Sequence, residues 1–238
     1  MIHGRTVLAV VPARGGSKGI PLKNLREVGG RSLIARVGDI VGGVPEVDRA
    51  IVSTDHALIK SAAESVGLAA PYMRPESISG DRIGDFDVLL HALESTEALD
   101  GNKYDIVVML QPTSPLRTSE QVSATIRMLV DGSWDSVWTV SETDTKAHPL
   151  KQLTVVDGVL NYYDTRGADI IARQQLQPVF HRNGIAYAIT RECLVKQRSI
   201  KGHRAGALVI QGPHLSIDTE EDIALVEWFL SRSSGSDR

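Results

Sequence analysis

The sequence is poor in the features that mark several common protein classes. Its 238 residues include a single cysteine, Cys193, so no disulfide can form within the chain and a reducing compartment is favoured. The formal net charge is -3, which provides no general attraction to nucleic acid or to an anionic membrane. The apolar run at residues 7–11 is too short for a signal peptide core or a membrane span. We therefore expect a cytoplasmic protein without nucleic acid or membrane partners.

Two widespread nucleotide-binding motifs are also missing, although the chain has a glycine-rich segment in a suitable place. This segment, VVPARGGSKGIPLKN at residues 10–24, directly follows the first apolar run. Gly15, Gly16 and Gly19 do not have the spacing of G-x-G-x-x-G, and G-x-x-x-x-G-K-[ST] finds no match. Neither a dinucleotide fingerprint nor a P-loop explains the segment.

The order of predicted strands and helices indicates an α/β fold. Apolar, β-branched runs alternate with helical patterns through the first 140 residues, which is typical of a parallel sheet covered by helices. Asp55 and Ser119 are candidate N-caps of the second and fourth helices. We predict strands at residues 6–11, 50–53, 105–110 and 136–140, and helices around residues 33–41, 58–66, 88–93 and 122–130.

The pattern changes between residues 143 and 180. Residues 153–160 predict a β-hairpin with Asp157 and Gly158 in its turn. The parallel pattern then resumes at residues 185–189 and 207–210, and a last helix is expected at residues 219–230. The predicted fold is a mostly parallel, Rossmann-like sheet with helices on both faces over residues 1–142 and 181–230, a small antiparallel insertion at 143–180, and a disordered tail at 231–238.

The glycine-rich segment has the composition of a phosphate-binding loop. A flexible turn at the carboxyl end of a strand lets several N–H groups face one anion. Arg14, Lys18 and Lys23 add up to three positive charges, which suits a triphosphate with a departing pyrophosphate. The alternative is a solvated basic turn, which the clustering of cations at a strand end disfavours.

A longer series of motifs resembles one enzyme family. PARGGSKGIPLKN is similar to the signature of the acylneuraminate cytidylyltransferases, or CMP-sialic acid synthetases, and of their relatives that act on other nine-carbon ulosonic acids. The resemblance implies a fold of the nucleotide-diphospho-sugar transferase type and a homodimer in which the insertion contacts the partner. Further motifs follow in the family's order: IVSTD at 51–55, RPESIS at 74–79, LQPTSPLR at 110–117, HPLK at 148–151, RQQL at 173–176, RNGIAY at 182–187 and IDTEED at 217–222.

The resemblance also implies a reaction. CMP would pass from CTP to the anomeric hydroxyl of a nonulosonic acid, with release of pyrophosphate and with Mg²⁺ as cofactor, or Mn²⁺ as its substitute. Positioning and neutralisation of phosphate charge supply most of the rate in such a transfer. By the motif match the catalytic residues would be Arg14, Lys18, Lys23 and Asp218, and the CTP-binding residues Arg14, Ser17, Lys18, Lys23, Asn24 and Arg74.

The sugar would meet a second group of matched residues. Lys151 and Arg173 are the candidates to pair with its carboxylate. Read without the family, these two are surface charges, Thr113 and Ser114 form a proline-bracketed turn, and His148 is a turn residue. The sugar-binding residues that the resemblance implies are Gln111, Thr113, Ser114, Lys151, Arg173 and Tyr187.

The expected metal site departs from the family. Many relatives have Asp-Ile-Asp-Thr, in which two carboxylates on one face of an extended segment reach a metal. This chain has Ser216-Ile217-Asp218-Thr219. Asp218 is therefore the expected metal ligand and Ser216 a further candidate, with one negative charge fewer. Asp218 alternatively lies just outside a helix capping box that begins at Thr219. A second departure is Asp85, where some relatives have a small hydroxylic residue.

Two rival functions remain at this stage. One keeps the fold and changes the substrate to the eight-carbon acid Kdo or to a sugar phosphate, although Lys151 and Arg173 do not suit a sugar phosphate. The other is a nucleotide-binding protein without catalysis, in which Ser216 marks a lost metal site.

Overall fold

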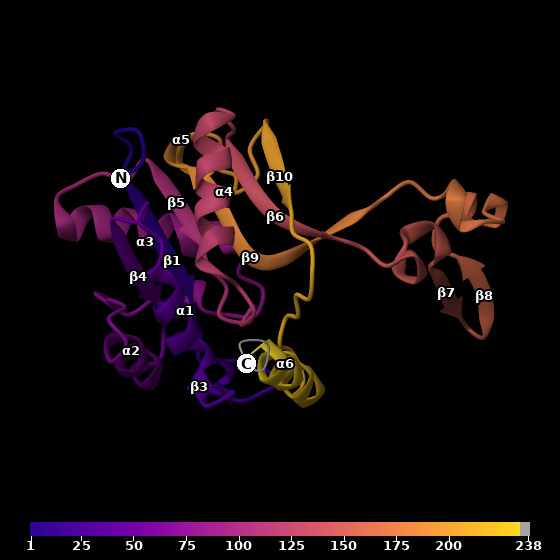
Figure 1. Cartoon of the computed structure of the whole chain (residues 1–238), viewed down its shortest axis with the longest axis horizontal. Coiled ribbons are helices and arrows are strands. Elements are labelled where there is room, and N and C mark those ends of the chain that lie inside the picture. Colours follow the sequence, from indigo (N-terminus) through magenta and orange to yellow (C-terminus); the bar gives the residue numbers. More distant parts are fainter. Residues whose placement is uncertain (234–238) are drawn as a thin grey trace. The chain divides into compact units, whose positions relative to one another are not determined.

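The computed structural model describes residues 1–233 and contains one main sheet. Its six strands have the order β10-β6-β9-β5-β1-β4 (Figure 1). Two short two-stranded sheets accompany it, β2-β3 and β7-β8. The strands of the main sheet are β1 (Val7–Pro12), β4 (Arg49–Ser53), β5 (Ile106–Met109), β6 (Ser136–Glu142), β9 (Phe180–Thr190) and β10 (Ala205–Val209).

Three strands carry the parallel part of the sheet. β1 pairs in parallel with both β4 and β5, so that Val10 lies opposite Ile51 on one side and Met109 on the other. The carboxyl ends of all three strands therefore meet at one edge, and the segments that follow them begin there. Ligands of open α/β sheets bind at this edge.

The direction of β9 corrects the sequence prediction. Residues 185–189 do form a strand, but β9 runs antiparallel to β5, with Val107 opposite Ile189. The parallel pattern therefore does not resume there. Residues 183–189 are all buried, and a strand buried on both faces shows the same continuous apolar run in either direction. The sequence pattern thus predicted the strand without its direction.

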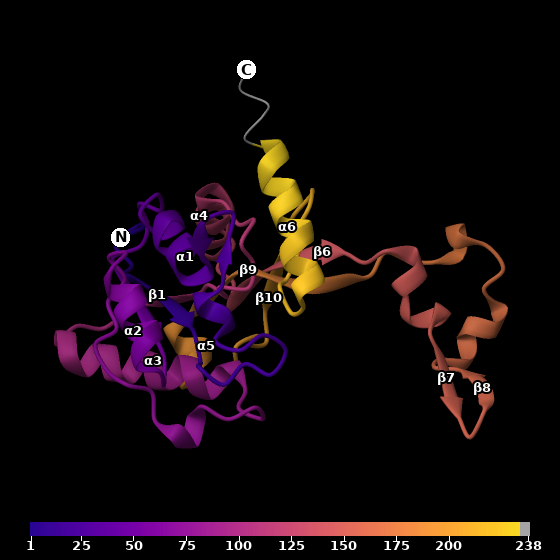
Figure 2. The same cartoon turned by 90° about the horizontal axis from the view of Figure 1, so that it is seen from below.

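Helices cover both faces of the sheet, as predicted. Val7, Ala9 and Val11 of β1 point to one face and pack with α1 (Leu33–Val41), α2 (Ala57–Glu64) and α4 (Ser119–Asp131). Leu8 and Val10 point to the opposite face and pack with α3 (Asp85–Asp100) and with α5 (Arg191–Val195), a short helix that was not predicted. Figure 2 shows α1 and α4 on one side of the sheet and α3 and α5 on the other.

Two predicted N-caps are each wrong by one residue. α2 is capped by His56, whose ring accepts the N–H of Leu58. α4 is capped by Thr118, which forms a reciprocal capping box with Gln121. The side chains expected as caps have other partners: Asp55 accepts the N–H of Gly15, and Ser119 donates to a carbonyl of α1. Each tertiary contact removes its side chain from the capping position.

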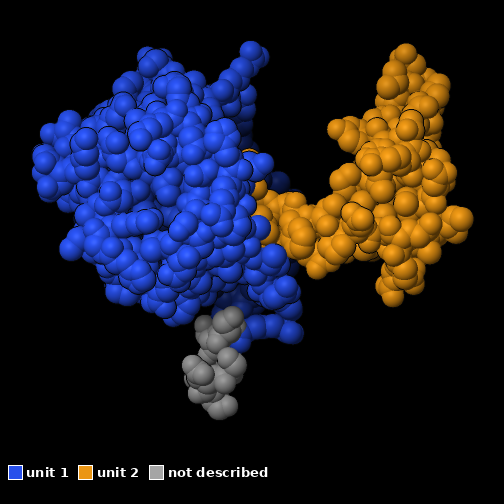
Figure 3. Space-filling view, turned by 90° about the horizontal axis from the view of Figure 1, so that it is seen from above, with its two compact units in different colours: residues 1–139, 183–238 blue, residues 140–182 orange. Residues whose placement is uncertain are grey.

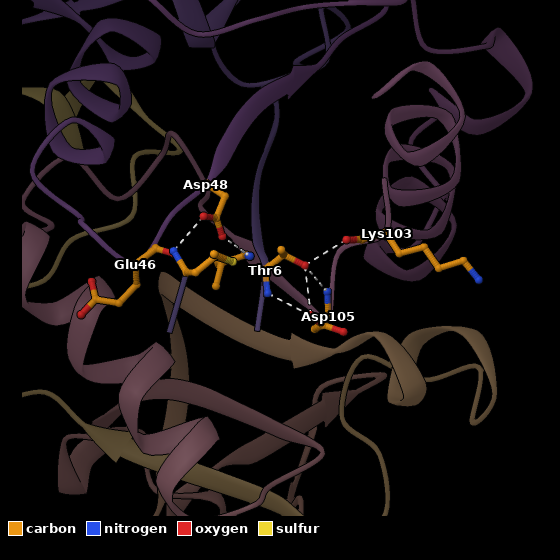
Figure 4. Close-up of polar contacts among 7 residues, drawn as sticks. Thr6, Glu46, Asp48, Lys103 and Asp105 are labelled. Carbon is orange, nitrogen blue, oxygen red and sulfur yellow. Dashed lines mark hydrogen bonds and ion pairs between the residues drawn. The ribbon is translucent and has the colours of Figure 1, made fainter. Parts of the chain in front are cut away.

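Polar contacts fix the start of β1 between its two neighbours (Figure 4). The Thr6 N–H donates to Asp105 Oδ2 at 2.9 Å, just before β5. Asp48, just before β4, accepts the N–H of Val7 and the amino group of Met1, both at 2.7 Å. The three parallel strands are thereby held in register at the edge opposite their carboxyl ends.

The last helix, α6 (Glu220–Ser233), packs through Ile223 and Val226 against Val28 of β2 (Glu27–Val28), which pairs with β3 (Arg31–Ser32). The helix continues past its expected end at residue 230. Residues 231–233 are therefore helical, not part of a disordered tail, and the rest of the predicted tail, 234–238, lies outside the described residues.

Contacts divide the chain into two compact units, coloured separately in Figure 3. The α/β unit comprises residues 1–139 and 183–238, and the hairpin unit comprises residues 140–182. The hairpin unit contains β7 (Leu153–Val156) and β8 (Val159–Tyr162). Asp157 and Gly158 both have positive φ, 52° and 79°, which confirms the predicted hairpin turn. Among residues 1–233, no helix has the length and apolar character needed to cross a membrane.

Candidate active site

A cavity of about 580 Å³ lies at the carboxyl edge of the parallel strands. All of its lining residues belong to the α/β unit, and they come from the segments after β1 and β5, from residues 74–88, and from the segment before α6. The cavity thus brings together stretches far apart in the sequence. It contains ten of the candidate residues: Arg14, Ser17, Lys18, Lys23, Asn24, Arg74, Gln111, Thr113, Ser216 and Asp218.

The glycine-rich segment is shaped by close contacts with the end of β4. The Gly15 N–H donates to Asp55 Oδ1 at 2.8 Å. A Cβ atom at position 15 would lie 2.8 Å from the His56 ring, so only glycine fits between the two segments. Asn24 is buried, and its amide nitrogen donates to the carbonyl of Arg14 at 2.9 Å. These contacts fix the backbone that carries the predicted phosphate-binding side chains.

Arg14 and Lys18 share one carboxylate. Arg14 Nη1 lies 2.8 Å from Asp81 Oδ1, and Lys18 Nζ lies 2.7 Å from Asp81 Oδ2. The Lys18 ammonium, followed by the Arg14 guanidinium, lowers the pKa of Asp81. Sequence reasoning did not single out Asp81, because one aspartate in a polar loop gives no signal until the fold brings it to the cations.

Lys23 joins the glycine-rich segment to the segment before α6. Its Nζ donates to the carbonyl of Ile217 and to Asp218 Oδ1, both at 2.7 Å. The Lys23 side chain is 15% exposed and that of Asp218 is 73% exposed. The two segments also touch at Gly19, where a Cβ atom would lie 2.6 Å from the Asp218 carbonyl oxygen. Lys23 and Asp218 are therefore held together at one wall of the cavity.

Arg74 is a buried cation that reaches the cavity. Its main-chain N–H donates to Thr54 at 2.7 Å, and its Nε donates to Ser79 at 3.3 Å. Its Nη2 lies 3.9 Å from Asp55 Oδ1 and has no hydrogen-bond partner among the described residues. Burial lowers the pKa of Arg74, although Asp55 opposes this shift. A buried donor of this kind favours a ligand contact.

Gln111 is held by a buried arginine that sequence reasoning did not assign to the site. Arg117 donates to the carbonyls of Gln111 at 2.6 Å, Gly184 at 2.8 Å, and Ile185. Burial lowers the pKa of Arg117 to about 9, so its guanidinium remains charged at neutral pH. Gly184 has a φ of 73°, and a Cβ there would lie 2.6 Å from Gln111 Oε1. The sequence indicated a link between Arg117 and the site only through its position at the end of the LQPTSPLR motif.

Four candidate sugar residues do not line the cavity. Ser114 and Tyr187 are buried: the Ser114 hydroxyl donates to the Asn183 carbonyl, and the Tyr187 hydroxyl accepts the N–H of Gly184. Both side chains support the turn beside Gln111 and do not face the cavity. Lys151 and Arg173 belong to the hairpin unit.

The candidate metal ligands lie in the cavity together with Asp85. In residues 1–233, no group of three or more His, Cys, Asp or Glu side chains could hold a metal ion. The capping box expected at Thr219 is confirmed: Thr219 Oγ1 accepts the N–H of Asp222, and Asp222 Oδ2 accepts the N–H groups of Asp218 and Thr219 at 2.9 and 2.8 Å. The Asp218 carboxylate takes no part in this box. One carboxylate and the Ser216 hydroxyl fit a Mg²⁺ ion that takes its other oxygens from phosphates and waters.

The sequences of known proteins support the family resemblance. A cytidylyltransferase family model matches residues 8–230. The chain is 30% identical over 219 residues to the N-acylneuraminate cytidylyltransferase of Streptococcus agalactiae. The aligned region covers 90% of this chain and 51% of that protein. It is 28% identical over 226 residues to the CMP-N,N'-diacetyllegionaminic acid synthase of Legionella pneumophila, covering 93% and 94%. The chain thus spans about half the length of the streptococcal relative and nearly all of the other.

A solved structure confirms the predicted fold. The structure of a CMP:2-keto-3-deoxy-manno-octonic acid synthetase has a TM-score of 0.68 and 20% identity, and it covers 96% of this chain and 99% of that one. This likeness concerns the arrangement of the sheet and its helices. The match of the family model over most of the sequence shows that the chain belongs to the cytidylyltransferase family.

Proposed function

We propose that this chain acts in the cytoplasm as a cytidylyltransferase that activates a nine-carbon ulosonic acid. The anomeric hydroxyl attacks the α-phosphorus of CTP, the CMP-sugar forms, and pyrophosphate leaves. The observation that carries this proposal is the cavity at the sheet edge, where four cations of the α/β unit meet. A cluster of cations suits a reaction in which the charge of the phosphates is neutralised during transfer. The four cations are Arg14, Lys18, Lys23 and Arg74.

Lys23 is our candidate for charge stabilisation at the reacting phosphate. Its ammonium has three N–H groups, of which two are used by Ile217 and Asp218. The third can donate to a phosphate oxygen. Because the Lys23 side chain is only 15% exposed, its charge is less screened than that of Lys18, which is 80% exposed. Arg14, Ser17 and Lys18 would bind the remaining phosphates.

The cytidine would lie beside Asn24 and Arg74. The buried Nη2 of Arg74, which has no hydrogen-bond partner in the described part of the chain, supports a contact with the nucleoside. The Asn24 amide nitrogen is already used by the loop, so its Oδ1 is the atom left to accept a hydrogen bond. A buried donor next to a fixed acceptor suits selection by hydrogen bonding.

Asp218 and Ser216 would hold Mg²⁺, or Mn²⁺ in its place. When bound, this ion supplies positive charge that polarises the phosphate oxygens. Asp218 would contribute one carboxylate oxygen while Lys23 keeps the other in position. With Ser216 in place of a second carboxylate, the cations of the glycine-rich segment would carry a larger share of the charge neutralisation.

The sugar acid would bind beside Gln111, whose main chain Arg117 holds in place. Thr113 also lines the cavity there. Lys151 and Arg173 of the hairpin unit would pair with the sugar carboxylate. A nonulosonic acid is the proposed substrate class because the two relatives described above are named for an N-acylneuraminate and a diacetyllegionaminic acid.

A homodimer would bring the hairpin unit of one copy to the active site of the other. The hairpin unit exposes many large apolar side chains, and a two-stranded hairpin is marginally stable by itself. A second copy of the chain is the partner that we propose. The exposed side chains are Leu153, Val155, Val156, Val159, Leu160, Tyr162, Tyr163, Ile171 and Phe180.

The experiment that tests this function is a substrate panel with pyrophosphate release as readout. We expect release only when CTP, Mg²⁺ and one nonulosonic acid are all present, the candidates being N-acetylneuraminate, its deaminated form, legionaminate and pseudaminate. Kdo and a sugar phosphate test the rival enzymes. No release with any sugar and any nucleoside triphosphate would contradict the proposal, and calorimetric CTP binding without turnover would then favour a non-catalytic protein.

A further inference from the structure

Asp81 directs a negative charge at the cations expected to bind phosphate. Its two carboxylate oxygens are divided between them: Oδ1 lies 2.8 Å from Arg14 Nη1, and Oδ2 lies 2.7 Å from Lys18 Nζ. All three side chains line the cavity. The carboxylate thus uses the same donors that a phosphate group would use. An anion that reaches Arg14 and Lys18 must either share them with Asp81 or displace it.

Asp81 holds the two cations loosely enough to be displaced. The Lys18 side chain is 80% exposed and that of Asp81 is 40% exposed, so water and salt screen their pair. The contrast is the pair of Lys23 with Asp218, in which Lys23 is only 15% exposed and also donates to the Ile217 carbonyl. An aspartate carboxylate is ionised at neutral pH, and the contacts with Lys18 and Arg14 lower the pKa of Asp81 further.

We propose that Asp81 competes with phosphate oxygens for Arg14 and Lys18 and thereby weakens the binding of pyrophosphate in the cavity. Sharing the cations reduces their attraction for the phosphate, and displacing the carboxylate leaves a negative charge beside it. Both effects weaken the binding of pyrophosphate. The binding inference stands on these contacts alone. Its consequence for turnover, that Asp81 promotes the departure of the product pyrophosphate, rests on the proposed function.

The test is calorimetric binding of inorganic pyrophosphate to wild type and to Asp81→Asn, which keeps the shape of the side chain and removes its charge. Two exposed ion pairs correspond to a change in affinity of about 2- to 30-fold, so we expect the variant to bind pyrophosphate tighter by a factor in that range. Affinity for cytidine, which has no phosphate, should stay unchanged. Asp87→Asn is the matched control, because Asp87 is exposed and does not line the cavity.

The titration is made both with EDTA and with Mg²⁺. Tighter binding of pyrophosphate by Asp81→Asn in both conditions, with Asp87→Asn equal to wild type, supports the inference. Equal or weaker binding by Asp81→Asn, weaker binding in Mg²⁺ alone, the same gain in Asp87→Asn, or no measurable binding by any of the proteins overturns it. If the expected gain occurs but wild type releases no pyrophosphate from CTP with any sugar, the proposed function fails while this inference holds.

Discussion

Large apolar side chains are mostly buried in the α/β unit, whereas many of them are exposed in the hairpin unit. In the α/β unit they fill three buried clusters around the sheet and α6, where Leu8 and Val10 of β1 are fully buried. In the hairpin unit the side chains of Val155 and Leu160 are 68% and 63% exposed. The α/β unit therefore buries its own core, whereas the hairpin unit leaves its large apolar side chains exposed.

The two units differ in what they can contribute to function. The α/β unit supplies a preformed cavity whose walls are fixed by buried contacts, such as those of Arg117. The hairpin unit carries the two proposed carboxylate-binding residues, Lys151 and Arg173, on a scaffold with little core of its own. Chemistry should therefore depend on single residues of the α/β unit, and assembly on the apolar side chains of the hairpin unit.

The largest expected effect is that of Lys23→Ala on chemistry. Removal of a positioned charge at a reacting phosphate should lower kcat by about 10²- to 10³-fold, with little change in the thermal unfolding midpoint. Asp218→Asn should lower kcat less, since Lys23 remains together with Arg14 and Lys18. The measurement is initial-rate pyrophosphate release at saturating substrates.

Lys60→Ala is the matched control for Lys23→Ala, because Lys60 lies on α2 and pairs only loosely with Glu64, at 3.8 Å. Near-normal turnover of Lys23→Ala would remove its assigned role. A larger loss of kcat in Asp218→Asn than in Lys23→Ala would show that the Asp218 carboxylate contributes more to turnover than the Lys23 ammonium.

The next effect concerns assembly through the hairpin unit. Leu160→Asp should weaken the proposed dimer by about tenfold or more, because a charge would be buried at the interface. Sedimentation should then show monomers, while CTP binding by the α/β unit is retained. Asn161→Asp introduces the same charge at the next position of β8 and should leave the dimer intact. A monomeric wild type, or equal effects of both variants, would contradict the proposed interface.

A smaller effect is expected from the proposed carboxylate-binding residue of the hairpin unit. Arg173→Ala should raise KM for the sugar acid by about tenfold, the equivalent of one charge-assisted hydrogen bond, without changing KM for CTP. Arg166→Ala is the control, since Arg166 is an exposed arginine of the same unit that pairs with Asp164. A parallel rise in KM for both substrates would indicate a general structural role instead.

The smallest effect is on stability. Thr219→Ala removes the cap of α6 and should lower the free energy of unfolding by about 1 kcal/mol, whereas Ser231→Ala at the other end of the helix should cost little. Hydrogen bonds lower the pKa of Asp222, and the largest contribution comes from the N–H of Asp218. The stabilisation by Asp222 is therefore full above its ordinary pKa and is lost as pH falls through the lowered value. Urea unfolding at several pH values measures both effects.

The sequence predicted those parts of the fold that rest on local patterns. The periodicity of α1 and α4 and the Asp157-Gly158 turn each depend on residues close together in the chain, and all three were found. The direction of β9 depends on which strand lies beside it, which an apolar run does not record. The caps at His56 and Thr118 were missed because tertiary contacts drew away the side chains of Asp55 and Ser119.

Half of the residues that line the cavity were predicted from motifs, but the contacts among them were not. Motif matches named Arg14, Lys18 and Lys23, which do meet at one cavity. The carboxylate of Asp81 reaches two of them only because residues 75–84 fold back over the glycine-rich segment. Residue type and spacing do not indicate that a loop folds back onto an earlier segment. Tyr187 shows the reverse case, a motif residue that the fold buries beneath the site.

Gly184 sets a limit on how the turn beside Gln111 could be redesigned. Its φ of 73° would strain any residue with a side chain, and a Cβ atom there would lie 2.5 Å from Ser114 Oγ and 2.6 Å from Gln111 Oε1, so both of these side chains would have to move. We expect substitutions at this position to displace Gln111 and Ser114 and to destabilise the turn that carries them. Variants that probe the proposed sugar preference should therefore change Thr113, which is half-buried and lines the cavity, with position 184 held constant.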